Sequence, residues 1–127
     1  MQDRYVFKNL NPFGVFVGDC VVRAVGTALD LSWDKAYLGL VDYGFRMKNL
    51  PNANHVWGAF LYDNGFYKLT IRDRYPERYT VKAFCEEHPQ GTFVLATGEH
   101  VIAVKDGFYY DTWDSGDEIP IYYFYRR

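Results

Sequence analysis

Two β-rich segments joined by a two-residue turn constrain the fold of this chain more than any other feature. Residues 100–105 (HVIAVK) and 108–112 (FYYDT) flank the dipeptide Asp106-Gly107, which favours the tight turn of a β-hairpin. Two further β-rich runs, 92–97 and 119–126, are set apart from this hairpin by Gly or Asp residues. The C-terminal part of the chain is therefore predicted to form an antiparallel sheet.

The preceding part of the chain has apolar residues at helical spacing. Helices are predicted over residues 20–29, 33–44, 54–64 (or from 52) and 81–88, and short strands over 5–8 and 66–71. Helices come first and strands last, so the fold class is α+β, with N-terminal helices packed on a C-terminal antiparallel β-sheet. Residues 1–127 contain no repeat and no linker, and their number fits one domain.

Composition narrows the class of protein. Aromatic residues make up 20% of the chain, as expected for a sheet-rich domain. The formal net charge of −2 does not favour a nucleic-acid partner. No apolar run approaches the roughly 18 residues of a membrane span, and the first residues lack the apolar segment of a signal peptide. We therefore expect a cytoplasmic protein with no nucleic-acid or membrane partner; the sequence sets no oligomeric state.

The hairpin brings a histidine close to a carboxylate. Pairing outward from the turn sets Ile102 opposite Asp111 and His100 opposite Trp113, so His100, Ile102 and Asp111 share one face. His100 and Asp111 are then diagonal neighbours, roughly 7–8 Å apart along the backbone and within side-chain reach. An imidazole held by a carboxylate is the base that activates a nucleophile. Two alternatives stay open: His100 as a solvated residue at a strand start, and Asp114 as the competing carboxylate.

Cys20 supplies a candidate nucleophile. It falls at the first position of the helix predicted over 20–29, behind Asp19 as the N-cap. A helix N-terminus favours the reactive thiolate, and the backbone N–H of Cys20 can face an oxyanion. The alternative is a small core residue. The second cysteine, Cys85, is predicted to lie in the core, and with His88 alone it lacks the further ligands of a metal site. No metal or cofactor is expected.

These residues resemble a known family. The sequence GDC at 18–20, opening a helix, and GEHVIAV at 98–104, followed by a strand ending in Asp111, resemble the nucleophile helix and the histidine strand of papain-like cysteine peptidases. The order Cys, His, Asp agrees with that family. The compact size and the Asp-Cys dipeptide are similar to peptidases of the double-glycine leader type. Nearly the whole chain also resembles small proteins of phages and gut bacteria.

The resemblance implies a thiol hydrolase that cleaves a peptide or isopeptide bond in a peptide or protein substrate. Cys20 would attack the carbonyl carbon, His100 would take and return the proton, and Asp111 would hold the imidazole in the useful tautomer. A thioester acyl-enzyme would form and be hydrolysed by water. Transfer of the acyl group to an amine is left open by the same three residues.

One position departs from the family pattern. Papain-like enzymes place a Gln about six residues before the nucleophile to complete the oxyanion hole, and here that position is Gly14. Asn11 is the candidate replacement donor; its alternative role is a turn with Pro12. Trp113 is predicted to wall the active site beside His100, with core packing as the alternative.

Two other functions stay open on sequence grounds. The missing Gln motivates a catalytically inactive papain-like domain that binds a partner. The Tyr-rich composition motivates a phage accessory protein that binds one host partner through its surface. A hydrolase requires a reactive Cys20, whereas neither alternative does, so the chemistry of this thiol separates them.

Overall fold

The computed structural model describes residues 3–126 and confirms the α+β class. The helices are α1 (Cys20–Leu29), α2 (Trp33–Met47), α3 (Asn54–Asp63) and α4 (Val81–Glu87). The strands are β1 (Tyr5–Phe7), β2 (Tyr67–Thr70), β3 (Thr92–Ala96), β4 (Val101–Lys105), β5 (Phe108–Asp111) and β6 (Tyr122–Arg126). None of the helices within this described range is long and apolar enough to cross a bilayer.

The strands form one mixed sheet in the order β1-β5-β4-β3-β6-β2. The C-terminal strands β3 to β6 pair antiparallel, as predicted. The sheet as a whole is not antiparallel, because β1 forms one edge and runs parallel to β5, while β2 forms the other edge. Strand β6 begins at Tyr122 rather than at Ile119. Pro120 lies in that gap, and proline has no N–H to donate to a ladder.

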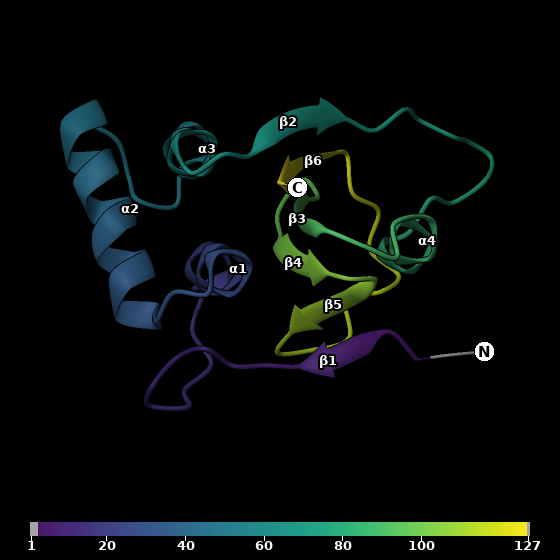
Figure 1. Cartoon of the computed structure of the whole chain (residues 1–127), viewed down its shortest axis with the longest axis horizontal. Helices are drawn as coiled ribbons and strands as arrows, with labels where there is room; N and C mark the ends of the chain where they lie inside the picture. The colour runs from purple at the N-terminus through teal and green to yellow at the C-terminus, as the bar shows by residue number, and fades with distance from the viewer. Residues whose placement is uncertain (1–2, 127) are drawn as a thin grey trace.

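The sheet is covered on both faces. Figure 1 shows α1, α2 and α3 on one side of the sheet and α4 on the other. Alternate residues of β3 follow this division: Val94 and Ala96 pack in the core beneath α1, whereas Phe93 and Leu95 pack beneath α4. The strand period of two therefore divides one sheet between two apolar cores.

Helix α2 begins as predicted and ends later. The Ser32 hydroxyl accepts a hydrogen bond from the Lys35 N–H at 3.1 Å, which caps the helix. The predicted stop at Gly44 was wrong, since α2 runs through Met47. Gly44 serves packing instead: a Cβ there would lie 2.7 Å from the backbone oxygen of Asn49 in the loop that turns back over the helix.

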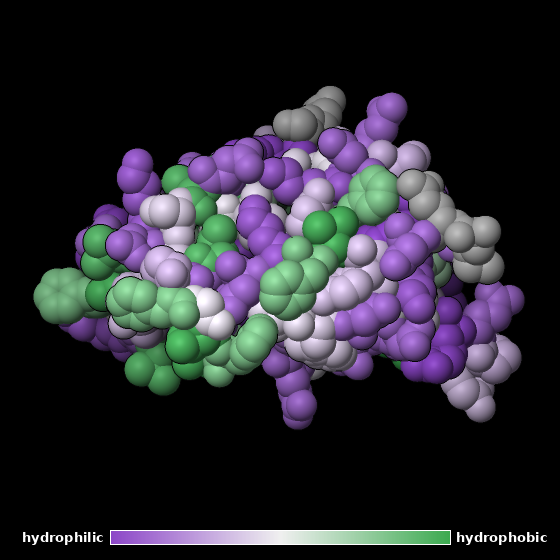
Figure 2. Space-filling view, turned by 90° about the horizontal axis from the view of Figure 1, so that it is seen from below, coloured by the Kyte–Doolittle hydropathy of each residue, from purple (hydrophilic) through white to green (hydrophobic). Residues whose placement is uncertain are grey.

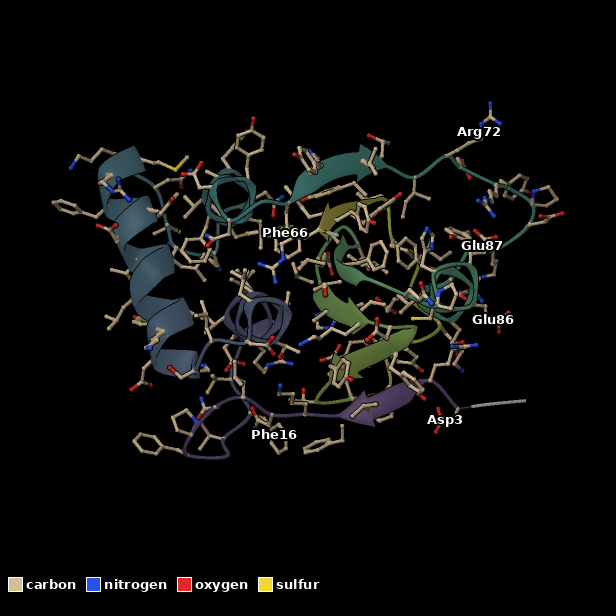
Figure 3. All side chains as sticks on the ribbon, in the orientation of Figure 1. Asp3, Phe16, Phe66, Arg72, Glu86 and Glu87 are labelled. Atoms are coloured by element: carbon tan, nitrogen blue, oxygen red, sulfur yellow. The ribbon has the colours of Figure 1, made fainter. Side chains whose placement is uncertain are left out.

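An apolar loop precedes α1 and faces outward. Phe13, Val15, Phe16 and Val17 are all exposed, and the Phe13 residue keeps 88% of its surface accessible. Phe16 lies on this loop in Figure 3. Apolar side chains also gather at the end of the molecule that carries α2 and this loop (Figure 2). The loop leads directly into α1, so this exposed surface adjoins the first residue of that helix.

Candidate active site

The open end of the β4–β5 hairpin lies against the N-terminus of α1. The hairpin pairs in the predicted register, with Val104 opposite Tyr109. His100 comes directly before β4, and Asp111 is the last residue of β5. The two side chains meet, with His100 Nε2 and Asp111 Oδ2 2.6 Å apart. The hairpin therefore holds an imidazole against a carboxylate.

His100 does not follow the alternation of β4. Ile102 packs in the core beneath α4, whereas His100 interacts with Cys20 on α1, which covers the opposite face. The prediction that His100 and Ile102 share a face was therefore wrong. The reason is that His100 lies outside the strand, in a turn where its backbone N–H donates to Thr97 Oγ1 at 3.0 Å. Free of the pleat, its ring can reach α1.

Cys20 is the first residue of α1 and is partly buried. Burial of the thiol opposes its ionisation, but other effects outweigh it. The hydrogen bond with His100, the backbone of Val101 and the positive charges of His100 and Arg23 together hold the pKa of Cys20 below its usual value. Because Nε2 of the imidazole faces Asp111, Nδ1 is the nitrogen that remains for the sulfur.

The environment of His100 favours its protonated form. Burial alone lowers the pKa of the imidazole, but the hydrogen bonds to Asp111 and Cys20 and their negative charges raise it to about 9. The imidazole is therefore protonated at neutral pH. Together with the lowered pKa of Cys20, this favours a thiolate–imidazolium pair, which is the reactive form of a cysteine nucleophile.

Cys85 has none of these features. It is fully buried in the core beneath α4, as the sequence predicts. Burial raises the pKa of its thiol to about 12. A thiol that stays protonated is a poor nucleophile, so Cys85 provides an internal reference for the reactivity of Cys20.

Asp111 is held by four hydrogen-bond donors in a fully buried position. Its Oδ2 accepts from His100 and from Ser115 Oγ at 2.7 Å, and its Oδ1 accepts from Arg23 Nη1 at 2.9 Å and the Thr112 N–H at 2.8 Å. Burial raises the pKa of the carboxyl, but the bonds to His100, Ser115 and Arg23 outweigh this effect and lower the pKa below its usual value, so Asp111 stays ionised. Asp111 thus remains a fixed anion behind the imidazole.

Arg23 and Ser115 are the site residues that the sequence reasoning missed. Arg23 Nε also donates to Asp19 Oδ1 at 2.8 Å, and Trp33 Nε1 donates to Asp19 Oδ2 at 2.9 Å. Asp19 stands at the N-cap position, yet its side chain makes no capping bond, so its predicted capping role was wrong. A sequence signal existed: Arg23 is the one charged residue in the apolar helix CVVRAVGTAL, and a charge at such a position needs a buried partner.

Trp113 and Asn11 take different places. The Trp113 ring lies beside His100, with ring centroids 5.0 Å apart, and is about half exposed. Asn11 forms a turn in which its Oδ1 accepts from the Phe13 N–H at 2.9 Å, the alternative that the sequence left open. The donors that adjoin the thiol are the backbone N–H groups in the first turn of α1, which Asp19 leaves uncapped.

A cavity of about 310 Å³ lies at the start of α1, lined by the chain neighbours of Cys20 but not by Cys20 itself. It lies among the residues just before Cys20, the start of α1, the start of α2 and the loop before α3. Trp33 and Tyr37 stack in its wall with ring centroids 4.8 Å apart. Asp19 is its charged lining residue, and both oxygens of that carboxylate already accept hydrogen bonds. The cavity thus offers an apolar surface next to the helix start that carries Cys20.

The protonation of this pair predicts a pH effect on stability. In the variant Cys20→Ala, we expect the free energy of unfolding to fall by about 1–2 kcal/mol as the pH rises from 6.5 to 9. In this variant the bond to Asp111 and its charge still raise the pKa of His100, so the folded protein keeps a proton which the unfolded chain releases near pH 6.5. That stabilisation is present below pH 6.5 and is lost as the pH rises toward the folded pKa.

The wild type should show a flatter pH dependence over this range. The lowered pKa of Cys20 acts in the opposite direction, because the folded chain releases a proton that the unfolded chain keeps up to about pH 8.5. The two contributions offset each other only while both partners are present. Urea unfolding at several pH values measures both proteins, and parallel pH profiles would contradict the thiolate–imidazolium pair.

Comparison of the chain with known proteins leaves the function to be argued from this site. Neither the protein-family models, nor the curated proteins, nor the solved structures gave a match. The structure places these three residues together where α1 meets the hairpin: Cys20 interacts with His100, and His100 is bonded to Asp111.

Proposed function

We propose that this chain is a papain-like thiol hydrolase that cleaves a peptide or isopeptide bond. One observation carries the proposal. The partly buried Cys20 thiol, at the N-terminus of α1, interacts with His100, whose Nε2 lies 2.6 Å from the fully buried carboxylate of Asp111. A nucleophile, a base and a residue that orients the base are the three parts that acyl transfer through a thiol requires.

The geometry supports the following sequence of steps. The Cys20 thiolate attacks the carbonyl carbon of the scissile bond, and backbone N–H groups of the first turn of α1 stabilise the oxyanion. The His100 imidazolium gives its proton to the leaving amine, which breaks the C–N bond and leaves a thioester on Cys20. His100 then takes a proton from water as the water attacks the thioester. The released products are the amine and the carboxylic acid, and the thiolate–imidazolium pair is restored. Asp111 stays ionised throughout.

The cavity at the start of α1 favours an uncharged segment of substrate. It is lined by residues on either side of Cys20 in the chain, its wall includes Trp33 and Tyr37, and its one carboxylate, Asp19, is fully engaged. A charged side chain placed there would lose hydration without gaining a partner. We therefore propose that an apolar side chain of a peptide near the scissile bond occupies this cavity.

Cleavage of a peptide mixture tests this function. Wild type and Cys85→Ala are expected to generate new peptide termini, with apolar residues enriched near the cleavage point, whereas Cys20→Ala generates none. The reason is that the thiolate forms the covalent intermediate, so the reaction has no route without it. Mass spectrometry of a peptide mixture incubated with each protein reads out the new termini. Equal product patterns for wild type and Cys20→Ala, or no cleavage by wild type, would contradict the proposal.

A second function is favoured by a separate observation. The loop before α1 exposes Phe13 and Phe16, and the side-chain oxygen of Asn11 accepts a hydrogen bond from the Phe13 N–H within that loop. A non-catalytic domain that binds a protein partner through this loop would use those aromatic side chains and would not need the thiol. In that case Cys20→Ala would retain partner binding and Phe16→Ala would lose it.

A further inference from the structure

Arg23 is a buried cation that bridges two buried carboxylates. Its Nε lies 2.8 Å from Asp19 Oδ1 and its Nη1 lies 2.9 Å from Asp111 Oδ1. The side chains of Arg23 and Asp19 are 11% and 6% exposed, and that of Asp111 is fully buried. Removing three charges from water is costly unless good geometry compensates. Such a group is retained where its placement serves a purpose that apolar packing cannot serve.

The position of Arg23 couples two parts of the triad. Arg23 lies on α1, one turn after Cys20, whereas Asp111 ends β5. The Arg23–Asp111 bond therefore joins the helix that carries the nucleophile to the strand that carries the orienting carboxylate. Asp19 accepts a hydrogen bond from Nε of the guanidinium, and Trp33 Nε1 donates to the other oxygen of the same Asp19 carboxylate.

The same bond fixes the rotation of the Asp111 carboxylate. Oδ1 accepts from Arg23 and from the Thr112 N–H, while Oδ2 accepts from His100 and Ser115. Turning the carboxylate away from His100 would break bonds on both oxygens. A guanidinium presents its donors in a rigid planar fork, so it serves Asp19 and Asp111 from two separate nitrogens, whereas a lysine ammonium is a point charge on a flexible stem that does not fix these two directions.

We propose that Arg23 is a positioning residue of the triad: it aims the Asp111 carboxylate at His100 and holds α1 in register with β5. This inference rests on the proposed thiol hydrolase function, which it deepens by one residue. Arg23 positions the triad through its bond to Asp111, and its charge also favours the Cys20 thiolate from a distance.

The pH dependence of Cys20 alkylation tests this role in two variants. The charged groups that face the thiol and Arg23 are His100 from the turn before β4, Asp111 from β5 and Asp19 from the start of α1. In Arg23→Gln, we expect iodoacetamide alkylation of Cys20 at pH 6 to slow about tenfold, because one nearby positive charge and the orienting bond are both lost. Arg23→Lys keeps the charge without the fork and should stay nearly as slow.

The imidazole of His100 gives a second readout. In wild type, the ring proton shared with Asp111 should give a downfield signal in the proton NMR spectrum, because the Nε2–Oδ2 distance is short. In both Arg23 variants this signal should weaken or move upfield. A residue with a merely structural role would lower the unfolding temperature and leave the signal of the folded protein in place.

The chain offers a matched control in α2. Arg46 Nη2 lies 2.8 Å from Asp42 Oδ2, with the same spacing along the helix as Arg23 and Asp19, but both side chains are largely exposed. Arg46→Gln therefore removes an Arg–Asp pair far more exposed than that of Arg23. We expect it to leave the alkylation profile and the His100 signal unchanged.

Each outcome bears on the inference separately from the function. A folded Arg23→Gln with a wild-type profile and His100 signal would overturn it, and so would full rescue by Arg23→Lys, which would show that charge alone suffices. Failure of both variants to fold would assign Arg23 to stability and equally overturn positioning. An unreactive wild-type Cys20 would remove the proposed hydrolase function, whereas the NMR signal of His100 would still report whether Arg23 positions Asp111.

Discussion

Iodoacetamide is expected to alkylate Cys20 at pH 6 about a hundredfold faster in the wild type than in His100→Ala. His100 hydrogen bonds to the thiol and supplies a positive charge beside it, and both effects hold the pKa of Cys20 below its usual value. Without the imidazole, the Val101 backbone and the charge of Arg23 are what remains to oppose burial of the thiol, which disfavours the thiolate. Intact-mass spectrometry over a range of pH values follows the rate of modification.

The two cysteines allow this experiment to be read cleanly. Both proteins carry Cys85→Ala as background, so Cys20 is their one thiol. In the chain that keeps Cys85, that cysteine should react slowly because burial raises its pKa to about 12. The wild-type rate should rise with an apparent pKa below the value of about 8.5 for a free thiol. Equal rates for wild type and His100→Ala would refute the activated nucleophile.

Asp111→Ala is expected to lower the free energy of unfolding by about 3–5 kcal/mol. Asp111 accepts hydrogen bonds from four donors while fully buried. Its removal leaves the buried guanidinium of Arg23 with Asp19 as its remaining carboxylate, and it strips the acceptor from His100 and Ser115. Unpaired buried polar groups lose their hydration without replacement. Urea unfolding followed by circular dichroism measures the change.

An exposed aspartate provides the comparison for that variant. Asp42 pairs with Arg46 at the surface of α2, with 59% of its side chain accessible. Exposed ion pairs contribute little because water already solvates both partners, so Asp42→Ala should change the unfolding free energy by under about 1 kcal/mol. Similar losses for the two variants would mean that the buried network does not stabilise the fold as its geometry implies.

Local sequence signals predicted the histidine–carboxylate pair. The Asp106-Gly107 turn fixes the hairpin register, and register fixes which residues stand near each other at its open end. Counting from the turn therefore brings Asp111 near His100 at that end, although the ring of His100 reaches it from outside the strand, and the helical spacing after Asp19 places Cys20 at the start of α1. These inferences needed no knowledge of distant contacts, since each depends on residues close together in the chain.

Long-range contacts could not be read in this way. Nothing in residues 5–7 shows that β1 will pair in parallel with β5, because strand partners far apart are chosen by the whole packing arrangement. Arg23 was visible as a charge on an apolar helix, but its partner Asp111 lies on a different element. Asp19 misled for a related reason: its side chain favours a cap locally, and the buried guanidinium binds it instead.

The separation of the triad along the chain has a consequence for protein synthesis. His100 and Asp111 are 11 residues apart, whereas Arg23 on the nucleophile helix and Asp111 are 88 residues apart. A ribosome releases the N-terminal part first, so Cys20 emerges long before the residues that activate it have been translated. Throughout elongation it remains an ordinary thiol. A polypeptide that lacks the hairpin would carry Cys20 without the imidazole that lowers the pKa of its thiol.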